Sequence, residues 1–540
     1  MRIAVSQINP ILGNFSYNAD KIIQFSKQAL DKNCDLVVFP ECALFGYHPF
    51  DLLERKKIVL QQEIAFKNLL KKLPKNIHVL FGLFTTNKSK KGRPYYNSAV
   101  LIYNGKVIKS FHKQLLPTGD VFDEARFIEP GNLEKNYFNI KGKKFFLTIC
   151  EDMWAWPDKF GNSLYSKNPI QSVKKQKIDL VLNLSASPWY KGKEIQRKYM
   201  VQKTAEFFKA PMMYVNLVGG QDEIVFDGSS FVCNQKGQIL LTCQSFEEDF
   251  NIFDLSTQTS WSQAPQIHSD EQLRRCLMLG IRDFSKKTGI KKVHLGSSGG
   301  IDSAVVACLA ADALGPQNVT TIALPGPFSS PDSERLASAL AKNLNVGFLK
   351  LNISDAYQTT LNDIIAAYGL SGFSVVNENL QARLRGLFLM AYSNKENSLL
   401  LTTGNKSEYS TGYATLYGDM CGGLAPIADL TKNQVYRLAK LYNQDYELIP
   451  SQIIDRAPSA ELRPNQKDQD SLPEYDLLDQ SVASIVENTN PAKTLTDKWL
   501  LEKLMATEFK RWQSAPIIKC SKHAFGRGRR FPVAHQAKEN

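Results

Sequence analysis

The second half of the sequence alternates short apolar runs with longer stretches of helical spacing, and this alternation restricts the fold more than any other feature. Apolar runs cover residues 291–296, 319–325, 346–353 and 398–405. Helical spacing begins at Ala304, Ser333 and Asp355 and returns over residues 379–392. Parallel strands need a long crossover between them, which is usually a helix. The pattern therefore predicts a parallel sheet covered by helices, with functional side chains where the strands end.

The first half also contains many short apolar runs, each ended by polar residues, glycine or proline. These runs lie at residues 2–7, 35–41, 78–84, 98–103, 106–113, 143–152, 179–188 and 211–219. Helical spacing over residues 18–30, 50–73 and 192–209 predicts a layered domain that mixes strands and helices. Residues 257–269, TQTSWSQAPQIHS, are polar and lack apolar periodicity. We predict a linker there, between domains of residues 1–256 and 270–540.

The composition excludes several classes of protein. A chain of 540 residues with 43% hydrophobic content, 32 glycines and 24 prolines is neither fibrous nor of low complexity. The first residues lack the apolar core of a signal peptide, and nothing later approaches the roughly 20 apolar residues of a membrane span. The nine cysteines form no CxxC pair. We therefore expect a cytoplasmic protein in a reducing compartment, with no zinc and no membrane partner.

The sequence carries more basic than acidic residues. Lys and Arg number 66 and Asp and Glu number 53, so the formal net charge is +13, and part of the excess lies within residues 510–530. This balance indicates an anionic partner without identifying it, because nucleic acid, a membrane surface and a small polyphosphate are all negative. The segment KHAFGRGRR near the end is compatible with an RNA-binding patch or a solvated tail, and we favour the tail.

A run of small residues follows the predicted strand at 291–296. It reads SSGGIDS, from Ser297 to Ser303, and leads directly into a helix. Backbone N–H groups at such a turn, together with the partial positive charge of a helix N-terminus, favour phosphate binding. An aspartate beside phosphate requires a cation between them, so Asp302 is a candidate Mg²⁺ ligand. The alternative is that the glycines form only a tight connection and Asp302 caps the helix.

The SGGIDS run resembles the pyrophosphate loop of the N-type ATP pyrophosphatases, which cleave ATP between its α and β phosphates. The later motifs NLQARLR, TTGNKSE, YGD and PIADLTK resemble those of the NAD synthetases, in the same order. The resemblance implies a Rossmann-like parallel α/β domain of the ATP pyrophosphatase type that binds ATP. The implied ATP-binding residues are Gly296, Ser297, Ser298, Gly299, Gly300, Ile301, Asp302, Ser303, Thr403 and Lys432.

The same resemblance implies a site for deamido-NAD. Asp302 and Glu408 are the implied Mg²⁺ ligands, and Lys432 would neutralise the phosphates of ATP. Each of these charges alone is more often found on the surface of a helix. The polar segment 458–479 matches a substrate-covering loop of this family. The implied deamido-NAD-binding residues are Asn379, Arg383, Glu408, Asp419 and Lys510.

Three reactive side chains in the first half each follow a predicted strand. Glu41 comes after DLVVFP, Lys113 after KVIKSFH and Cys150 after KKFFLTI. A lysine cation lowers the pKa of a neighbouring thiol and a carboxylate takes up its proton, so this set suits amide cleavage through a thioester. The commoner alternative for any one of the nine cysteines is a buried apolar side chain.

The words around these residues, FPE, HK, CEDMW and NLSASP, resemble the nitrilase superfamily, in the version that forms the glutaminase domain of NAD synthetases. The resemblance implies an α-β-β-α sandwich in which Glu41 is the general base and Cys150 the nucleophile. Lys113 would stabilise the oxyanion and orient the thiol. Glu124 matches an additional glutamate near this trio.

The glutamine-binding positions of the family are matched in part. Ser187 and Lys193 correspond to two residues that hold glutamine. The family commonly reads LPNYxVFDE after the lysine, whereas this chain reads LPTGDVFDE, so Gly119 replaces a tyrosine that contacts glutamine. We therefore expect this replacement to affect either the affinity for glutamine or the coupling of glutamine hydrolysis to the second site.

Together the two resemblances predict a glutamine-hydrolysing carbon–nitrogen ligase. It would amidate deamido-NAD to NAD through an acyl-adenylate, with Mg²⁺ as cofactor, ATP as co-substrate and ammonia from glutamine. The family forms homo-oligomers, so we expect one here, with small-molecule substrates and no nucleic acid. Two alternatives stay open: another glutamine-dependent ATP pyrophosphatase that amidates a different carboxylate, and a nucleic-acid-binding protein that uses its basic terminus.

Overall fold

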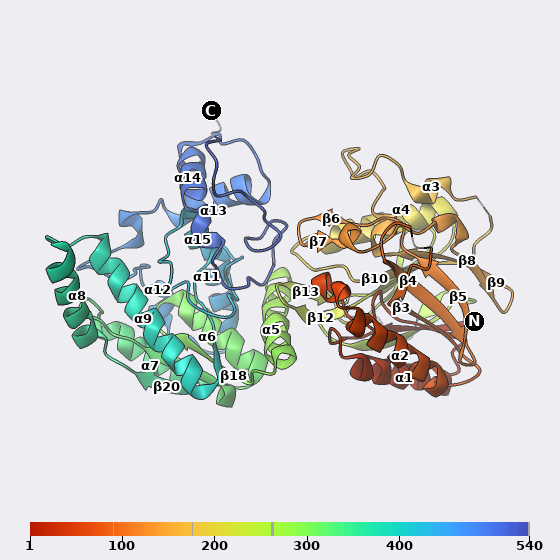
Figure 1. Ribbon diagram of the computed structural model, residues 1–540, viewed down its shortest axis with the longest axis horizontal. Helices are drawn as coiled ribbons and strands as arrows, with labels where there is room; N and C mark the ends of the chain where they lie inside the picture. Colours follow the sequence, from red (N-terminus) through yellow and green to blue (C-terminus); the bar gives the residue numbers. More distant parts are fainter. Residues whose placement is uncertain (90, 175, 261–263, 538–540) are drawn as a thin grey trace. The chain divides into compact units, whose positions relative to one another are not determined.

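The structure, a computed structural model, describes residues 1–89, 91–174, 176–260 and 264–537, which form two compact units (Figure 1). The first unit comprises Met1–Gln221 and Val225–Ile267, and the second comprises Asp222–Ile224 and His268–Asn540. Within the predicted linker, residues 261–263 lie outside the described residues. Just before them, strand β17 (Thr259–Ser260) pairs with β16 (Asp249–Asp254), so the predicted linker begins inside a sheet.

The first unit contains two large sheets. One has the strand order β17-β16-β1-β2-β3-β4-β5, with β1, β2 and β3 parallel and the other neighbours antiparallel. The other has the order β15-β14-β11-β10-β9-β8, with a parallel centre of β9, β10 and β11. The further strand bounds are β1 Arg2–Gln7, β2 Leu36–Val38, β3 His78–Thr86, β4 Tyr95–Tyr103, β5 Lys106–His112, β8 Tyr137–Ile140, β9 Lys143–Ile149, β10 Leu180–Ser185, β11 Met212–Asn216, β14 Phe231–Cys233 and β15 Ile239–Thr242.

Successive side chains of these strands point to opposite faces of their sheet, and the inner faces of the two sheets pack against each other. In β1, Ile3 and Val5 join a core that includes Phe145 and Leu147 of β9, whereas Ala4 points to the opposite face. Helices α1 (Phe15–Asp31) and α2 (Lys56–Lys72) cover that outer face, and α3 (Pro169–Ser172) and α4 (Lys193–Phe208) cover the outer face of the second sheet. The predicted α-β-β-α sandwich is confirmed.

Short elements complete the first unit. The hairpins β6–β7 and β12–β13 form two small sheets of their own. A 3₁₀ turn, η4, starts directly at the end of β9 and begins with Cys150. The bounds of these elements are η1 Phe50–Glu54, β6 Thr118–Gly119, β7 Phe122–Asp123, η2 Glu124–Arg126, η3 Leu133–Lys135, η4 Cys150–Met153, β12 Val218–Gln221 and β13 Ile224–Asp227.

The second unit is built on a four-stranded sheet with the order β20-β19-β18-β21, in which every pair of neighbours is parallel. This confirms the parallel α/β domain. Helix α6 is apolar nearly all round its surface and is buried from Ala304 to Ala311. The bounds are β18 Lys292–Gly296, β19 Val319–Ala323, β20 Gly347–Lys350, β21 Ser398–Leu400, α5 Ser269–Thr288, α6 Ile301–Leu314, α7 Pro331–Leu344, α8 Ser354–Tyr368 and α9 Val375–Glu396.

Helices that follow β21 form a second core of this unit. Residues from the neighbourhood of α10, α13 and α14 pack together there, with Leu478, Val482 and Leu500 fully buried. The segment over residues 458–474 contains only the short turn η6. The bounds are η5 Pro316–Asn318, α10 Lys406–Thr411, α11 Lys432–Tyr442, α12 Ser451–Asp455, η6 Asp468–Asp470, α13 Tyr475–Val482, η7 Ala483–Glu487, α14 Leu495–Ala506 and α15 Glu508–Arg511.

The basic residues near the end of the chain make internal contacts. Arg511 is 4% exposed and forms an ion pair with Glu508, and Arg529 reaches the same carboxylate at 3.4 Å. Phe525, in the middle of KHAFGRGRR, is 1% exposed and belongs to the core of the second unit. Our interpretation of this segment as a solvated tail is therefore wrong, because sequence composition does not show that Phe525 joins a core or that Glu508 is placed to receive Arg529.

No helix among the described residues has the length and apolar character that a membrane crossing requires. All nine cysteines belong to the described part of the chain and carry free thiols, and all but Cys421 are buried.

Candidate functional site

The first unit brings Glu41, Lys113 and Cys150 to one place, each at the end of a strand. Glu41 follows β2, Lys113 follows β5 and Cys150 starts η4 at the end of β9. Their exposed fractions are 1%, 0% and 5%. Cys150 has a φ of 41°, a left-handed conformation that a non-glycine residue adopts only when its surroundings hold it there. The sharp turn lets the thiol leave the strand end rather than continue into the sheet.

Lys113 is held between two carboxylates. Its Nζ lies 2.9 Å from Oε1 of Glu41 and 2.7 Å from Oε1 of Glu124, and all three side chains are buried. Two negative charges face a single ammonium group, so this cluster stays anionic when both carboxyls are ionised. Glu124, matched above to an additional family glutamate, thus lies in direct contact with the predicted trio.

Three further groups orient the carboxylates. Asn97 donates from Nδ2 to Oε1 of Glu41 at 2.7 Å, and the backbone N–H of Ala186 donates to Oε2 at 2.7 Å. The hydroxyl of Tyr47 donates to Oε1 of Glu124 at 2.8 Å. Glu41 therefore has fixed hydrogen bonds on both oxygens, which presents the carboxylate in one orientation.

The electrostatics suit a proton transfer from thiol to carboxylate. Burial, together with the charge of Glu41, raises the pKa of the Cys150 thiol well above its usual range, although Lys113 opposes this. Burial also raises the pKa of Glu41, against the influence of Lys113. The thiol is therefore neutral at rest, and the carboxylate beside it is more basic than a solvated one. This arrangement can form a thiolate when an electrophilic carbonyl arrives.

The three predicted glutamine-binding residues lie on different elements of the first unit. Ser187 is 3% exposed and follows β10, and Lys193 opens α4 with its Nζ 3.7 Å from the centroid of the Trp154 ring. Burial lowers the pKa of Lys193 to about 8, although Glu151 raises it. Trp154 directly follows η4, so Lys193 lies near the turn that carries Cys150.

Gly119 lies in the exposed hairpin β6–β7 and has a φ of 127°. A Cβ at this position would meet no atom within 4 Å, but the backbone conformation itself disfavours any L side chain. Restoring a tyrosine at this position would therefore require a change of backbone conformation as well as of side chain.

In the second unit, the SSGGIDS run forms the predicted turn between β18 and α6. Gly299 has a φ of 74°, and a Cβ there would come within 2.3 Å of the carbonyl oxygen of Ser333, so only glycine fits. The hydroxyl of Ser303 donates to the carbonyl of Gly300 at 3.0 Å, and the N–H of Gly300 donates to the hydroxyl of Ser298 at 3.2 Å. The loop is thus braced by its own serines at the N-terminus of α6.

Three charged side chains meet beside this loop. Asp302 pairs with Nζ of Lys432, and the same Nζ lies 3.7 Å from Oε1 of Glu408. Asn405 donates from Nδ2 to Oδ1 of Asp302 at 3.0 Å and forms a reciprocal capping box with Glu408 at the start of α10. Burial, with the neighbouring charge of Asp302, raises the pKa of Glu408 to about 8, against the pull of Lys432.

These residues fit the Mg²⁺ ion that the family implies. The charge of Asp302 disfavours ionisation of Glu408, so a cation between them would favour it, and carboxylate oxygens completed by substrate phosphates and water are the usual Mg²⁺ environment. Among the described residues, no group of three or more His, Cys, Asp or Glu side chains is arranged to hold a metal by itself. Asp302 and Glu408 would therefore hold the ion together with the nucleotide.

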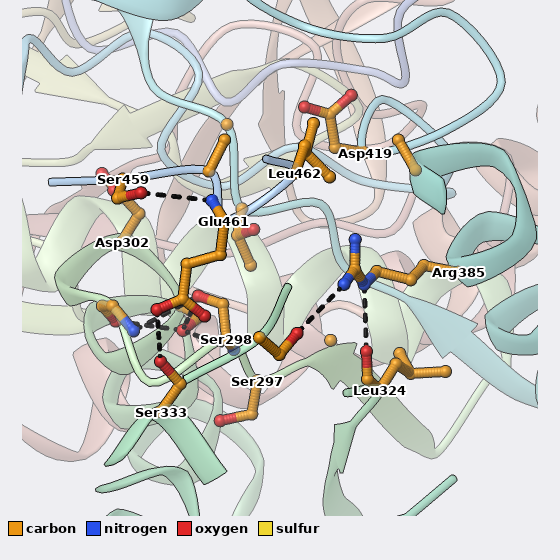
Figure 2. Close-up of a pocket in the computed structure, with 18 of the residues that line it drawn as sticks. Ser297, Ser298, Asp302, Leu324, Ser333, Arg385, Asp419, Ser459, Glu461 and Leu462 are labelled. Carbon is orange, nitrogen blue, oxygen red and sulfur yellow. Dashed lines mark hydrogen bonds between the residues drawn. The ribbon is translucent and has the colours of Figure 1, made fainter. Parts of the chain in front are cut away.

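A cavity of about 290 Å³ opens at this point of the second unit (Figure 2). Of the residues predicted to bind nucleotide or acceptor, eleven line it and four do not. Gly299 packs behind the loop against Ser333, and Asn379, Arg383 and Lys510 lie outside the lining. The eleven are Gly296, Ser297, Ser298, Gly300, Ile301, Asp302, Ser303, Thr403, Glu408, Asp419 and Lys432.

The segment 412–419 joins the remaining predicted acceptor residues. Lys510 donates from Nζ to the carbonyls of Gly412 and Ala414 at 2.8 and 2.7 Å. Thr415 donates its N–H to Asp419 at 2.6 Å and its hydroxyl to Oδ1 of Asn379 at 2.8 Å. Arg383 is exposed and donates from Nε to the carbonyl of Leu416 at 3.3 Å. All four predicted side chains therefore contact one loop, which borders the cavity through Asp419.

The sequence interpretation missed other residues of the cavity. Arg385 donates from Nε to the carbonyl of Leu324 at 3.0 Å, and its place two residues after Arg383 in NLQARLR was an available signal. Glu461, from the predicted covering segment, accepts a hydrogen bond from the hydroxyl of Ser333 at 2.8 Å (Figure 2). It also accepts one from the N–H of Ser330 at 3.2 Å. No motif marked Glu461, because the two serines that it contacts, Ser330 and Ser333, lie at the start of α7, far away in sequence.

Comparisons with known proteins agree for both units. Residues 2–263 match the family model of carbon-nitrogen hydrolases, and residues 274–516 match that of NAD synthases. Among curated proteins, a glutamine-dependent NAD(+) synthetase of Synechocystis is 41% identical, with 98% of each chain covered. One of Acinetobacter baylyi is 36% identical over 99% of this chain and 98% of the relative. The solved structure of a glutamine-dependent NAD⁺ synthetase from Acinetobacter baumannii, in complex with ADP, is 34% identical, covers 98% of both chains and has a TM-score of 0.78.

Proposed function

The chain belongs to the family of glutamine-dependent NAD(+) synthetases, and from this premise we propose how its residues divide the reaction. Residues 1–256 hydrolyse glutamine and release ammonia, and residues 270–540 use ATP and that ammonia to amidate deamido-NAD to NAD. The observation that carries this assignment is the presence in one chain of a buried Glu41–Lys113–Glu124 cluster beside a cysteine turn and of an Asp302–Lys432–Glu408 cluster beside a phosphate-type loop.

In the first unit, the Cys150 thiol gives its proton to Glu41 as Sγ attacks the carboxamide carbon of glutamine. Lys113 stabilises the developing oxyanion, and its pairing with two carboxylates keeps it protonated throughout. Glu41 then returns the proton to the leaving nitrogen, which departs as ammonia. Water activated by Glu41 cleaves the thioester and releases glutamate. Ser187 and Lys193 hold the glutamine.

In the second unit, a carboxylate oxygen of deamido-NAD attacks the α-phosphorus of ATP. The bond from this phosphorus to the oxygen that bridges it to the β-phosphorus breaks, so pyrophosphate leaves and an acyl-adenylate remains. Lys432 and the N–H groups of the SSGGIDS loop neutralise the phosphate charge that accumulates. Ammonia then attacks the activated carbonyl carbon, loses a proton and displaces AMP.

Mg²⁺, held by Asp302 and Glu408, would supply charge stabilisation at the phosphates when it is bound. We further propose that these two residues bind the cation only when the nucleotide is present, since without it Lys432 already pairs with both carboxylates. The proposal also includes a cytoplasmic location, supported by nine free thiols, and a homo-oligomeric state as in the family.

The proposal is tested by incubating the full chain with ATP, Mg²⁺ and glutamine and varying the acceptor. We expect AMP, pyrophosphate, glutamate and NAD with deamido-NAD, and no AMP with other carboxylates such as aspartate. Replacing glutamine by ammonium should support the same synthesis. Absence of AMP with deamido-NAD under either nitrogen donor would disprove the assignment, and AMP formed with a different carboxylate would favour another amidating ATP pyrophosphatase.

A further inference from the structure

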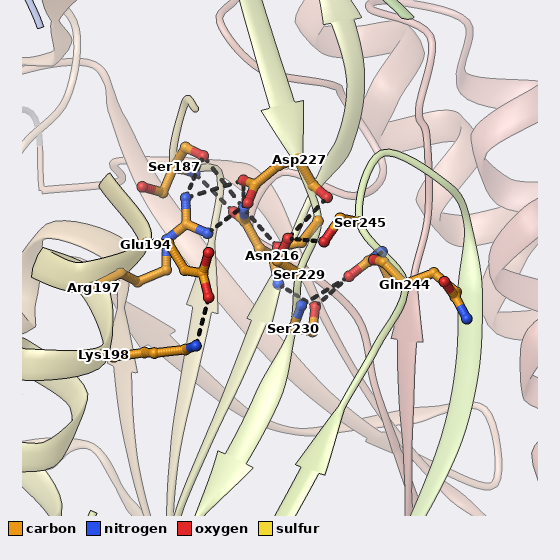
Figure 3. A network of polar contacts seen from close by, with 12 residues as sticks. Ser187, Glu194, Arg197, Lys198, Asn216, Asp227, Ser229, Ser230, Gln244 and Ser245 are labelled. Carbon is orange, nitrogen blue, oxygen red and sulfur yellow. Dashed lines mark hydrogen bonds and ion pairs between the residues drawn. The ribbon is translucent and has the colours of Figure 1, made fainter. Parts of the chain in front are cut away.

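A buried ion pair lies next to the predicted glutamine-binding residues and plays no part in the chemistry described above. Nη1 of Arg197 lies 3.0 Å from Oδ2 of Asp227, and Nη2 lies 3.0 Å from Oδ1, so the pair is bidentate (Figure 3). Arg197 is 1% exposed and Asp227 is 2% exposed. Arg197 lies on α4 and Asp227 ends β13, so the pair fastens the helix to the hairpin.

The pair contacts the backbone of Ser187 directly through Arg197 and indirectly through Asn216. The carbonyl oxygen of Ser187 accepts from Nη2 of Arg197 at 3.5 Å and from Nδ2 of Asn216 at 3.3 Å. Its N–H donates to Oδ1 of the same asparagine at 2.9 Å. Asn216 in turn donates to Oδ1 of Asp227 at 3.3 Å. Both the N–H and the carbonyl of Ser187 are therefore held by a network that ends at the ion pair.

The same pair fixes the position of Lys193. Residues four apart on a helix share one face, so Arg197 anchors α4 one turn after Lys193. The helix begins at Lys193, after Gly192 in a left-handed conformation, and therefore has no further helical turn before it to hold that lysine. Anchoring at Arg197 sets where the ammonium group of Lys193 lies over the Trp154 ring.

Stability alone does not account for this arrangement. Removing two charges from water costs free energy that their attraction often fails to recover, so a buried pair is weak evidence of a stabilising role. Among the described residues, Nε of Arg197 also has no hydrogen-bond partner. The pair does fix positions, because its hydrogen bonds converge on Ser187 and it anchors the helix that carries Lys193.

We propose that Arg197 and Asp227 are positioning residues for glutamine, which act by fixing the backbone of Ser187 and the helical turn of Lys193. The inference rests on the proposed function, in which these two residues hold the substrate. Neither member of the pair contacts Glu41, Lys113 or Cys150 in the hydrogen bonds and ion pairs described. The effect of disturbing the pair should therefore fall on glutamine binding and spare the chemical step.

The test compares Arg197→Met, Arg197→Lys and Asp227→Asn with wild type. We expect KM for glutamine to rise by about tenfold or more in Arg197→Met and Asp227→Asn, because small misplacements of binding groups weaken substrate positioning. Arg197→Lys, which keeps the charge but loses the bidentate geometry, should show a smaller rise. The kcat for glutamine hydrolysis should change far less than KM, and ammonium-supported NAD synthesis should equal that of wild type.

A matched control is the next residue on α4. Lys198 forms a partly exposed ion pair with Glu194 on the same helix (Figure 3), so Lys198→Met should leave KM for glutamine unchanged. An unchanged KM in both Arg197→Met and Asp227→Asn, or a fall in kcat at constant KM, would overturn the inference. Parallel loss of ammonium-supported synthesis in both would show a purely structural role and also overturn it. Failure of wild type to hydrolyse glutamine would instead disprove the proposed function.

Discussion

Replacing Cys150 by alanine is expected to lower glutamine-supported NAD synthesis by about a thousandfold or more, because no other group supplies the nucleophile. Synthesis from ammonium should stay within about twofold of wild type, since the acyl-adenylate is formed by residues of the second unit. Both rates are measured by following NAD formation with each nitrogen donor at saturating ATP and deamido-NAD.

Cys233→Ala provides the matched control for this experiment. Cys233 lies in β14, in the sheet that also contains the strand before Cys150, and is 1% exposed. Its substitution therefore removes another buried sulfur without changing Glu41, Lys113 or Glu124. It should retain both activities. Loss of ammonium-supported synthesis in Cys150→Ala would contradict the division of labour, and retention of glutamine-supported synthesis would contradict the choice of nucleophile.

Replacing Asp302 by asparagine is expected to reduce formation of AMP and pyrophosphate by about a hundredfold or more with either nitrogen donor. The substitution keeps an oxygen that can accept from Asn405 but removes the charge that faces Lys432 and the proposed Mg²⁺. The measurement is release of pyrophosphate from ATP in the presence of deamido-NAD, with ammonium and with glutamine in separate reactions.

The control for Asp302 lies ten residues further along the same helix. Asp312 forms a partly exposed ion pair with Arg274, away from the cavity, so Asp312→Asn should keep a normal rate of AMP formation. An Asp302→Asn variant that still forms AMP and pyrophosphate at the wild-type rate would disprove the metal and phosphate assignment. Near-ultraviolet circular dichroism of both variants checks that each is folded.

The sequence predicted the parallel sheet of the second unit because periodicity is a local property. Apolar runs and helical spacing were enough for the parallel sheet of the second unit, and the family resemblance supplied the sandwich of the first. Glu41, Lys113 and Cys150 could be selected because each follows a strand, and the structure places them together. Asp302 was selected from the run that follows a strand, whereas Glu408 and Lys432 came from the family resemblance, and the three side chains also meet.

What the sequence did not reveal depends on contacts between distant segments. The N–H of Ala186 that binds Glu41 carries no side-chain signal, and Asn97 is one polar residue within an apolar strand. Gly119 could be read as a lost tyrosine, but its positive φ is a backbone property that sequence does not show. The contact of Arg529 with Glu508 was missed for a similar reason, because the two residues are 21 positions apart and meet only in three dimensions.

The transfer of glutamine nitrogen into NAD is the most direct test of this account. The full chain is incubated with ATP, Mg²⁺, deamido-NAD and glutamine labelled with ¹⁵N in its amide, and the NAD formed is analysed by mass spectrometry. The account predicts that wild-type product carries the label and that Cys150→Ala yields no labelled NAD. Unlabelled NAD from the wild type, or labelled NAD from the Cys150→Ala variant, would contradict it.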